Sequence, residues 1–315
     1  MAQQTIAVVG ATGAQGGGLV RAILADTSGA FKARAITRRP DSDNAKALAA
    51  QGVEVVAGDA DDASSLDAAF AGAHGVFCVT NFWEHGDPAR ELRQASALAR
   101  ATKRAGVQHV VWSTLEDTRR DIPVSDPRLP TLKDHYKVPH FDAKGEADAV
   151  FAAEAAPTSY LLAAFYWDNL IHFGMGPRAQ ADGSLVFALP LGGQKLPGIA
   201  AADIGGCAFG IFKRGASAAG GRFGIAGDIL SGDEMAAALG KALGKTVTFQ
   251  DVPFDVYRGL GFPGADDLGN MFEYQQLMGD RFLQSRDPKL TRELNPGAAD
   301  FATWLSHNAG RIAIG

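Results

Sequence analysis

Short apolar stretches alternate with stretches of helical spacing over the first 113 residues, and this alternation restricts the fold more than any other feature. The predicted strands occupy residues 5–9, 31–37, 53–56, 75–80 and 107–113. Helices are predicted between them at residues 17–24, 43–50, 64–70 and 88–105. Strands joined through helices of this length form right-handed crossovers, and strands that are apolar throughout are buried on both faces. The sequence therefore predicts an α/β protein with a doubly wound parallel sheet.

Glycine is concentrated after the first strand. The chain has 38 glycines, about 12% of its residues against a usual ~7%. Gly10, Gly13 and Gly16 form the pattern G-x-x-G-x-x-G directly between a predicted strand and a predicted helix. Such a turn brings backbone N–H groups close to a pyrophosphate, which then lies at the positive end of the helix. We expect a dinucleotide-binding turn of the Rossmann type; the alternative is a turn that is merely tight.

The residues after the second strand indicate which dinucleotide is bound. Arg38 and Arg39 follow that strand, and no acidic residue occurs before Asp41. A guanidinium holds the 2′-phosphate of NADP through two hydrogen bonds, whereas an acidic residue would bind the ribose hydroxyl of NAD. The pair therefore favours NADP(H), unless it is only a solvated surface pair. Asp59, after the third strand, is expected to border the adenine, to cap the next helix, or both.

Charge and cysteine content exclude several classes of protein. Lys and Arg number 30 against 35 Asp and Glu, a formal net charge of −5, and the basic residues form no stripe. A nucleic-acid-binding surface is therefore not expected. Cys78 and Cys207 stand far apart in apolar surroundings, so we expect two buried thiols and neither a disulfide nor a metal site. The chain shows no signal-peptide pattern and no membrane-length apolar run, which favours a soluble, cytoplasmic protein.

The strand–helix rhythm is lost in the second half of the chain. A charged, proline-containing connection spans residues 114–138, followed by a helix at 139–153 and a strand at 159–165. The elements predicted beyond it are helices at 203–212 (with Asp203 as cap), 233–243, near 256 and 271–278, and strands at 185–189 and 246–251. We expect a Rossmann domain at residues 1–157 and a smaller C-terminal α/β domain at 158–315, some of whose segments return to the main sheet.

Four segments together are similar to one protein family. They read V-V-G-A-T-G-A-Q-G-G (8–17), V-T-N-F-W-E (79–84), H-F-D-A-K-G-E (140–146) and G-F-P-G-A-D-D-L-G-N-M-F (261–272). Over about residues 5–310 the chain resembles the NmrA-like family of atypical short-chain dehydrogenase/reductases, most closely the redox-sensor branch that contains human NmrA-like family domain-containing protein 1. The glycine motif is shared across the superfamily, whereas the other three segments are more specific. The resemblance implies a Rossmann domain, a smaller C-terminal domain and a preference for NADP(H).

The resemblance, together with the turn and the strand ends, implies a set of cofactor contacts. The expected contacts are Gly10, Thr12, Gly13, Gln15, Gly16, Arg38, Arg39, Asp59, Ala60, Thr80, Asn81, Phe82, Lys144, Phe165 and Asn169. Asn81 and Phe82 follow the fourth strand, beside the expected ribose and nicotinamide. Phe165 and Asn169 belong to the segment that closes over the nicotinamide in this family, although Ala163–Ala164 replaces the usual Arg-Pro before the aromatic residue.

The usual catalytic pair of the superfamily is incomplete here. Its reductases use Tyr-x-x-x-Lys, in which both side chains share one helix face and the lysine lowers the pKa of the tyrosine. Lys144 stands four residues after His140, and Tyr136 lies eight residues before the lysine, ahead of the predicted helix. His140 is either a proton donor or a structural residue of the first turn. Ser113 and Thr114 occupy the helper positions, or only satisfy backbone groups.

Two functions stay open at this point. Without the tyrosine, Lys144 can still hydrogen-bond the nicotinamide ribose, which favours a redox-sensing or regulatory protein that responds to NADPH/NADP⁺. The alternative is an NADPH-dependent reductase of quinone- or enone-like acceptors, which need no dedicated tyrosine. The expected partner is accordingly a regulatory protein or a small-molecule electron acceptor, with no nucleic acid or membrane involved. The aromatic stretch 259–278 is expected to roof the pocket, to face a partner or simply to pack.

Overall fold

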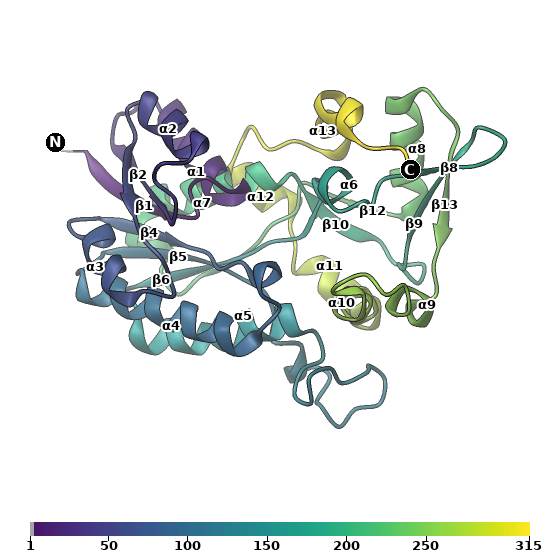
Figure 1. Ribbon diagram of the computed structural model, residues 1–315, viewed down its shortest axis with the longest axis horizontal. Coiled ribbons are helices and arrows are strands. Elements are labelled where there is room, and N and C mark those ends of the chain that lie inside the picture. Colours follow the sequence, from purple (N-terminus) through teal and green to yellow (C-terminus); the bar gives the residue numbers. More distant parts are fainter. Residues whose placement is uncertain (1–2) are drawn as a thin grey trace.

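Seven parallel strands form the central sheet of the computed structural model, which describes residues 3–315 (Figure 1). The strands are β1 (Gln4–Val9), β2 (Phe31–Thr37), β3 (Glu54–Ala57), β4 (Gly75–Cys78), β5 (His109–Thr114), β6 (Thr158–Leu162) and β11 (Arg222–Gly224). Their order is β11-β6-β5-β4-β1-β2-β3, so the strand order reverses between β1 and β4. The predicted doubly wound parallel sheet is confirmed, and ligands of such sheets bind at the carboxyl ends of the strands beside this reversal.

Helices cover both faces of the main sheet. They are α1 (Ala14–Ala25), α2 (Asp43–Ala50), α3 (Ala63–Phe70), α4 (Pro88–Arg104), α5 (Pro139–Glu154) and α7 (Ala201–Arg214). The buried side chains of α1 and α7 cluster with those of β1 on one face, and those of α3, α4 and α5 cluster on the other. Cys78 and Cys207 lie in these two clusters, buried and unbonded as predicted. No helix within residues 3–315 is both long and apolar enough to cross a membrane.

Two predicted helix caps are wrong. Asp62 caps α3 by accepting a hydrogen bond from the amide of Ser64, so Asp59 does not cap that helix. The chain first makes a tight bend between Asp59 and Asp62, which delays the start of the helix. Helix α7 begins two residues ahead of Asp203, whose carboxylate instead accepts a hydrogen bond from the amide of Ala299 (2.9 Å). The side chain therefore ties α7 to the segment before the last helix.

The second half of the chain extends the main sheet and also builds two small sheets. Strands β6 and β11 both lie beyond residue 157 and pair with each other in the main sheet. The predicted strand 159–165 is too long, because the chain leaves the main sheet after Leu162 and Phe165 pairs with Gly198 in another sheet. The small sheets are formed by β7 (Phe165–Tyr166), β10 (Leu196–Ile199) and β12 (Asp228–Leu230), and by β8 (Arg178–Ala179), β9 (Leu185–Leu189) and β13 (Val247–Asp251). The division into domains at residue 157 stays a prediction.

Several helices complete the second half of the chain. They are α6 (Asn169–His172), α8 (Gly232–Leu243), α9 (Phe254–Arg258), α10 (Ala265–Met278), α11 (Asp280–Gln284), α12 (Pro288–Leu294) and α13 (Phe301–Asn308). Of these, α8, α9 and α10 lie with the small sheets on the right in Figure 1. Single 3₁₀ turns are η1 (Phe82–Glu84), η2 (Thr118–Arg120), η3 (Gly215–Ala218) and η4 (Ala309–Arg311). A separate apolar cluster, which includes Phe187, Tyr274 and Trp304, forms the core of this half.

Helices α1 and α7 contact each other backbone to backbone. A Cβ on Gly18 would lie 2.1 Å from the carbonyl oxygen of Ala202, and one on Gly205 would lie 2.0 Å from the amide nitrogen of Leu19. A side chain fits at neither position, because protein interiors leave no room for such an overlap. Gly18, one of the glycines that follow the first strand, is therefore needed for the packing of α1 against α7 and not for the turn.

A buried lysine organises the long connection between β5 and α5. Lys137 is 1% exposed, and its Nζ donates hydrogen bonds to the carbonyl oxygens of Asp126 (2.7 Å) and Leu129 (2.6 Å). The same Nζ donates to the hydroxyl of Thr131 (3.0 Å). Desolvation lowers the pKa of Lys137. The predicted surface connection 114–138 is thus an ordered loop closed around one ammonium group.

Candidate functional site

The glycine turn leaves the amino end of α1 open. Gly10 has a φ of +65°, a conformation that favours glycine. A Cβ on Gly16 would lie 2.4 Å from the carbonyl oxygen of Gly10. Gly13 is the N-cap residue, and no side chain caps the helix and no acidic residue stands in its first turn. The free N–H groups and the helix dipole, with Thr12 in the same turn, therefore form a cradle that fits a pyrophosphate.

Gln15 joins this turn to two other strands. Its Oε1 accepts a hydrogen bond from the hydroxyl of Ser113 at the end of β5 (2.8 Å). Its Nε2 donates to the hydroxyl of Tyr166 on β7 (2.5 Å). Burial raises the pKa of Tyr166 to about 12, so this hydroxyl is protonated at neutral pH. Tyr166, a residue absent from the expected set, thus reaches the turn, while the expected Phe165 packs against Phe272 in the core of the second half.

Arg38 lies at the end of β2 and forms an ion pair with Glu84 of η1. The distance from Nη1 to Oε1 is 2.5 Å, and the two side chains are 50% and 39% exposed. This hydrogen bond raises the pKa of Arg38 and lowers the pKa of Glu84. Arg39 is exposed beside it, and Asp59 and Ala60 are half-buried after β3. The residues predicted to bind the adenosine half of the cofactor therefore lie at the ends of the adjacent strands β2 and β3. The carboxylate of Glu84, which the sequence analysis did not predict, lies beside them.

Lys144 of α5 reaches a buried polar cluster at the end of β4. Its Nζ lies 2.8 Å from Oε1 of Glu91 and donates to the hydroxyl (2.8 Å) and the carbonyl oxygen (3.1 Å) of Thr80. The Thr80 hydroxyl donates in turn to Glu91 (2.6 Å). Burial alone would raise the pKa of Glu91, but the charge and hydrogen bonds of Lys144 outweigh it and hold that pKa below its ordinary value. Glu91, from α4, therefore fixes the position of the Lys144 ammonium group.

His140 and Asp267 connect the two halves of the molecule one helical turn from Lys144. Nδ1 of His140 lies 2.6 Å from Oδ1 of Asp267, whose Oδ2 accepts a hydrogen bond from the His140 backbone amide (3.1 Å). Because positions four apart on a helix share a face, His140 and Lys144 lie on the same side of α5. Nε2 of His140 makes no hydrogen bond within residues 3–315, and this nitrogen keeps some surface that is accessible to solvent. One ring nitrogen therefore stays free.

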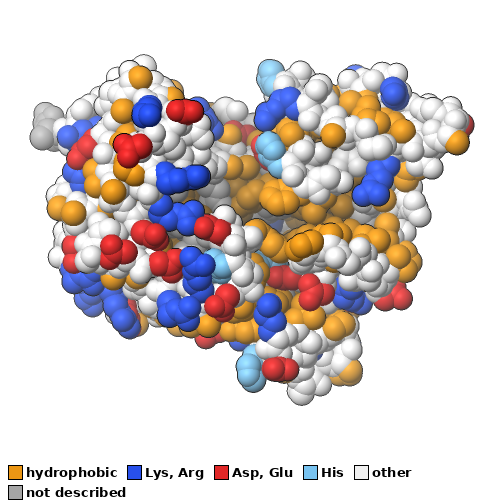
Figure 2. Space-filling model, in the orientation of Figure 1, with side chains coloured by type: hydrophobic (Ala, Val, Ile, Leu, Met, Phe, Trp, Pro, Cys, Tyr) orange, Lys and Arg blue, Asp and Glu red, His pale blue; other side chains and the backbone are white. Residues whose placement is uncertain are grey.

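Aromatic side chains surround this histidine. The Trp83 ring lies 4.8 Å from the His140 ring and the Phe82 ring lies 6.1 Å from it, both measured between centroids. Trp83 is 44% exposed, and a Cβ on Gly264 would lie 2.6 Å from its ring. Figure 2 shows hydrophobic side chains gathered in the hollow between the two halves, whereas charged side chains crowd the left half of this face. The free nitrogen of His140 thus lies beside aromatic surfaces.

Other predicted residues take no part in this cluster. The Tyr136 ring lies 5.0 Å from the Arg119 guanidinium, so it does not replace the missing tyrosine. Thr114 donates its hydroxyl to Asp148 (2.6 Å), which favours a packing role. Asn81 is exposed immediately before η1. Asn169 begins α6 and its side chain makes no hydrogen bond within the described part of the chain, so its cofactor contact stays a prediction.

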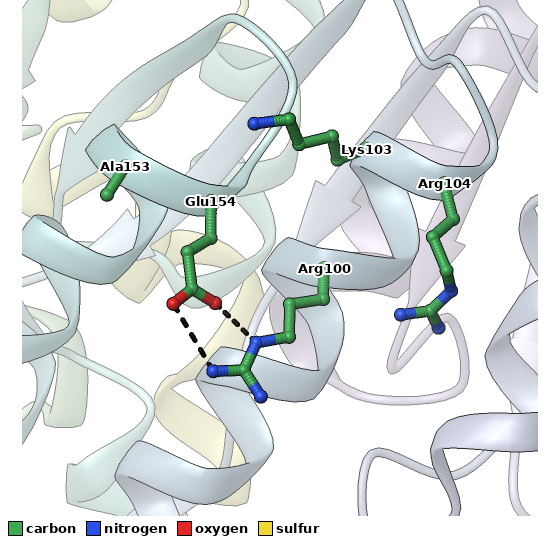
Figure 3. Close-up of a pocket in the computed structure, with 5 residues that line it drawn as sticks. All are labelled: Arg100, Lys103, Arg104, Ala153 and Glu154. Atoms are coloured by element: carbon green, nitrogen blue, oxygen red, sulfur yellow. Dashed lines mark hydrogen bonds and ion pairs between the residues drawn. The ribbon is translucent and has the colours of Figure 1, made fainter.

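A separate hollow lies between the carboxyl-terminal ends of α4 and α5 (Figure 3). It has a volume of about 340 Å³ and is lined by Arg100, Lys103, Arg104, Ala153 and Glu154. Arg100 pairs with Glu154 across it, and the Arg104 guanidinium binds Asp67 instead (2.6 Å). Helices α4 and α5 run antiparallel to the strands, so their carboxyl-terminal ends lie at the amino ends of the strands. The glycine turn lies at the carboxyl ends, and we therefore assign this hollow no role in the site.

Comparison with known proteins settles the family. The pattern of the NmrA-like family matches residues 2–305 of this sequence. The chain belongs to the NmrA-like family. The family resemblance carried by the four segments is therefore confirmed, whereas membership of the redox-sensor branch stays a prediction.

Named relatives of this NmrA-like protein include oxidoreductases. It is 28% identical over 303 residues to the NmrA-like family domain-containing oxidoreductase lnbB of Aspergillus flavus, a match that covers 90% of this chain and 86% of the relative. It is 30% identical over 275 residues to the NAD(P)H azoreductase of Xenophilus azovorans, covering 85% and 86%. The crystal structure of Nmra, a negative transcriptional regulator, in complex with NADP has a TM-score of 0.74 at 23% identity, covering 98% of this chain and 95% of that one. This last likeness shows the shared fold.

Four residues of the candidate site escaped the sequence analysis: Glu84, Glu91, Tyr166 and Asp267. Glu84 and Asp267 lie in the family-specific segments 79–84 and 261–272, which is a signal for a role but not for a partner. Tyr166 directly follows an expected contact. Glu91 carried no signal, because a glutamate in a predicted surface helix is ordinarily solvated.

Proposed function

We propose that this NmrA-like protein binds NADP(H) and reduces apolar, conjugated acceptors. The observation that carries the proposal is the hydrogen bond between His140 and Asp267, one helical turn from Lys144. The open amino end of α1 fits the pyrophosphate of such a cofactor, and Arg38 lies where its 2′-phosphate is expected. The names of the two curated relatives and the NADP complex of Nmra support the same reaction class and cofactor.

The residues of the site divide the work of a reduction between them. Bound NADPH supplies a hydride, and the acceptor needs a proton as well to balance it. Thr80 and Glu91 hold the Lys144 ammonium where it can hydrogen-bond the nicotinamide ribose. Asp267 holds the Nδ1 side of the His140 ring, which leaves Nε2 to donate the proton to the acceptor heteroatom and to regain one from water.

The surroundings of His140 indicate the class of acceptor. Trp83, whose ring lies 4.8 Å from that of His140, is 44% exposed and is contacted by Gly264. Phe262, two residues before Gly264 in the chain, is 38% exposed. Flat aromatic or conjugated molecules bind well against such rings. Quinones, enones and azo compounds therefore form the test panel.

The loss of absorbance at 340 nm tests the proposal. NADPH is mixed with the protein and with each acceptor of the panel, and the expected result is steady consumption over many turnovers with at least one of them. The variant His140→Asn is expected to bind NADPH as the wild type does and to lose most of this turnover. NADPH that binds tightly but is not oxidised by any acceptor contradicts the reductase proposal.

A redox-sensing role is the second candidate, because a short segment connects the expected 2′-phosphate site with the second half of the molecule. In η1, Glu84 pairs with Arg38, and the adjacent Trp83 packs against His140 and Gly264. A ligand at Arg38 can thus shift contacts between the two halves. The sensor is expected to bind NADPH more tightly than NADP⁺ or NAD⁺ and to leave it unoxidised; equal affinities contradict it.

A further inference from the structure

We propose that Glu84 sets the cofactor selectivity of this protein, because its carboxylate competes with a 2′-phosphate for Arg38. The inference rests on the proposed NADP(H) site. Glu84 comes from the turn after β4 and reaches across to the end of β2, 46 residues earlier in the chain, where its Oε1 lies 2.5 Å from Nη1 of Arg38. A phosphate that binds Nη1 of Arg38 must therefore displace this carboxylate, and one that binds Nε and Nη2 lies next to it.

The charges around Arg38 make Glu84 its principal partner. Asp59 acts on Arg38 only through its more distant charge. Arg90, another cation whose charge acts on Arg38, is already held by Asp61 at 2.6 Å. The direct side-chain partner of Arg38 among the described residues is thus one carboxylate, which occupies Nη1, one of the nitrogens that could bind a phosphate.

The backbone that carries Glu84 is anchored, so the carboxylate cannot move far away. The Glu84 amide donates to the carbonyl oxygen of Asn81 (3.2 Å), and the Gly86 amide donates to that of Phe82 (2.7 Å). Phe82 is buried, and Trp83 packs against Gly264. A displaced Glu84 side chain therefore rotates within a few ångströms of the incoming phosphate, well inside the ~8 Å Debye length of physiological salt.

The two dinucleotides experience this carboxylate differently. A phosphomonoester carries about −1.5 to −2 charges at neutral pH, so the ionised Glu84 repels it and also withholds Arg38 from it. The ribose 2′-hydroxyl of NAD(H) carries no charge and can donate a hydrogen bond to a carboxylate. Arg38 raises the affinity for NADP(H) relative to NAD(H), and Glu84 makes this difference in affinity smaller.

Adenosine 2′,5′-bisphosphate and 5′-AMP test the inference, because they differ only in the 2′-phosphate and contain no nicotinamide. Calorimetric titration of the full chain is expected to show that Glu84→Gln tightens bisphosphate binding by roughly 3- to 10-fold and leaves 5′-AMP binding unchanged or slightly weaker. The matched control is Glu54→Gln, which removes a carboxylate paired with Arg34 at 2.8 Å and is expected to change neither affinity. The gain in Glu84→Gln is expected to shrink as salt is raised.

The outcomes separate the inference from the site itself. Bisphosphate binding that is unchanged or weakened in Glu84→Gln, with normal binding by the wild type, overturns the role of Glu84 alone. Equal tightening of both probes also overturns it, because the effect then has nothing to do with the 2′-phosphate. A wild-type protein that binds neither probe overturns the proposed cofactor site and this inference with it.

Discussion

Lys144 and Glu91 form a buried ion pair, with Nζ 2.8 Å from Oε1, between the helices α5 and α4. The Glu91 side chain is fully buried, and Thr80 bonds both partners. Such a pair adds little net stability, but removing one partner leaves the other charge buried and uncompensated. The pair therefore couples the position of the proposed ribose-binding lysine to the packing of two helices.

The variant Glu91→Gln is expected to lose about 3 kcal/mol of unfolding free energy at pH 7, because Lys144 is left without its counter-ion. Urea denaturation measures this loss. The control Glu154→Gln breaks the exposed pair with Arg100 and is expected to change the unfolding free energy much less, because solvent screens that pair. Equal losses in the two variants would mean that Glu91 does not compensate the charge of Lys144.

The variant Arg38→Asp is expected to weaken NADPH binding by roughly 10- to 100-fold and to change NADH binding little, because only NADPH carries the 2′-phosphate. Titration of cofactor fluorescence gives both dissociation constants. Arg120→Asp, at an exposed position of η2, serves as the charge-matched control. An unchanged ratio of the two constants refutes the assignment of Arg38 to the 2′-phosphate.

The variant Asp267→Asn is expected to lower kcat by roughly 10²- to 10⁴-fold, because the His140 ring is no longer held for proton transfer. Its dissociation constant for NADPH is expected to be unchanged, and this split distinguishes a role in proton transfer from general damage to the site. The exposed neighbour Asp266 provides the control Asp266→Asn. Loss of NADPH binding together with kcat in Asp267→Asn points to a structural role alone.

Acid sensitivity is expected from His109, a buried residue whose Nε2 lies 2.9 Å from the hydroxyl of Ser159. Burial, with a smaller contribution from His74, lowers the pKa of His109 to about 4 from an ordinary 6.5. Between these two pH values the unfolded chain binds a proton that the folded protein does not, so stability falls as the pH drops from about 6.5 to about 4. Relative to His109→Gln, the wild type is expected to lose up to about 3 kcal/mol over this window. Parallel pH dependences of the two proteins, measured by urea denaturation, contradict the assignment.

The variant Gly18→Ala is expected to destabilise the fold by about 2 kcal/mol or more, although alanine is the better helix former. Its Cβ would lie 2.1 Å from the carbonyl oxygen of Ala202, so α7 must move away from α1. Gly310→Ala is the control, since nothing lies within 4 Å of a Cβ there. Thermal unfolding compares the two variants, and equal melting temperatures would refute the close contact between these helices.

Much of the first half was predictable because its signals are local. The strand–helix alternation predicted β1 to β5 and the helices between them, with boundaries displaced by a few residues. The G-x-x-G-x-x-G pattern predicted the turn, where Gly10 adopts a positive φ. The small sheets were less accessible, because β7 and β8 have two residues each and show no periodicity. The cap predicted at Asp203 was wrong, because α7 already begins at Ala201, two residues before the first polar residue that could cap it.

The sequence by itself determined the family, the main sheet and the glycine turn before α1, because each depends on neighbours a few positions apart. Only the tertiary structure decided how the charged groups are paired. His140 and Asp267 are 127 residues apart, and helix packing joins them where the two halves meet. Glu84 and Glu91 likewise meet their partners across different strands and helices. Pairings of this kind depend on the three-dimensional arrangement of elements, and it is this arrangement that turns an apparently incomplete motif into a site with an oriented histidine.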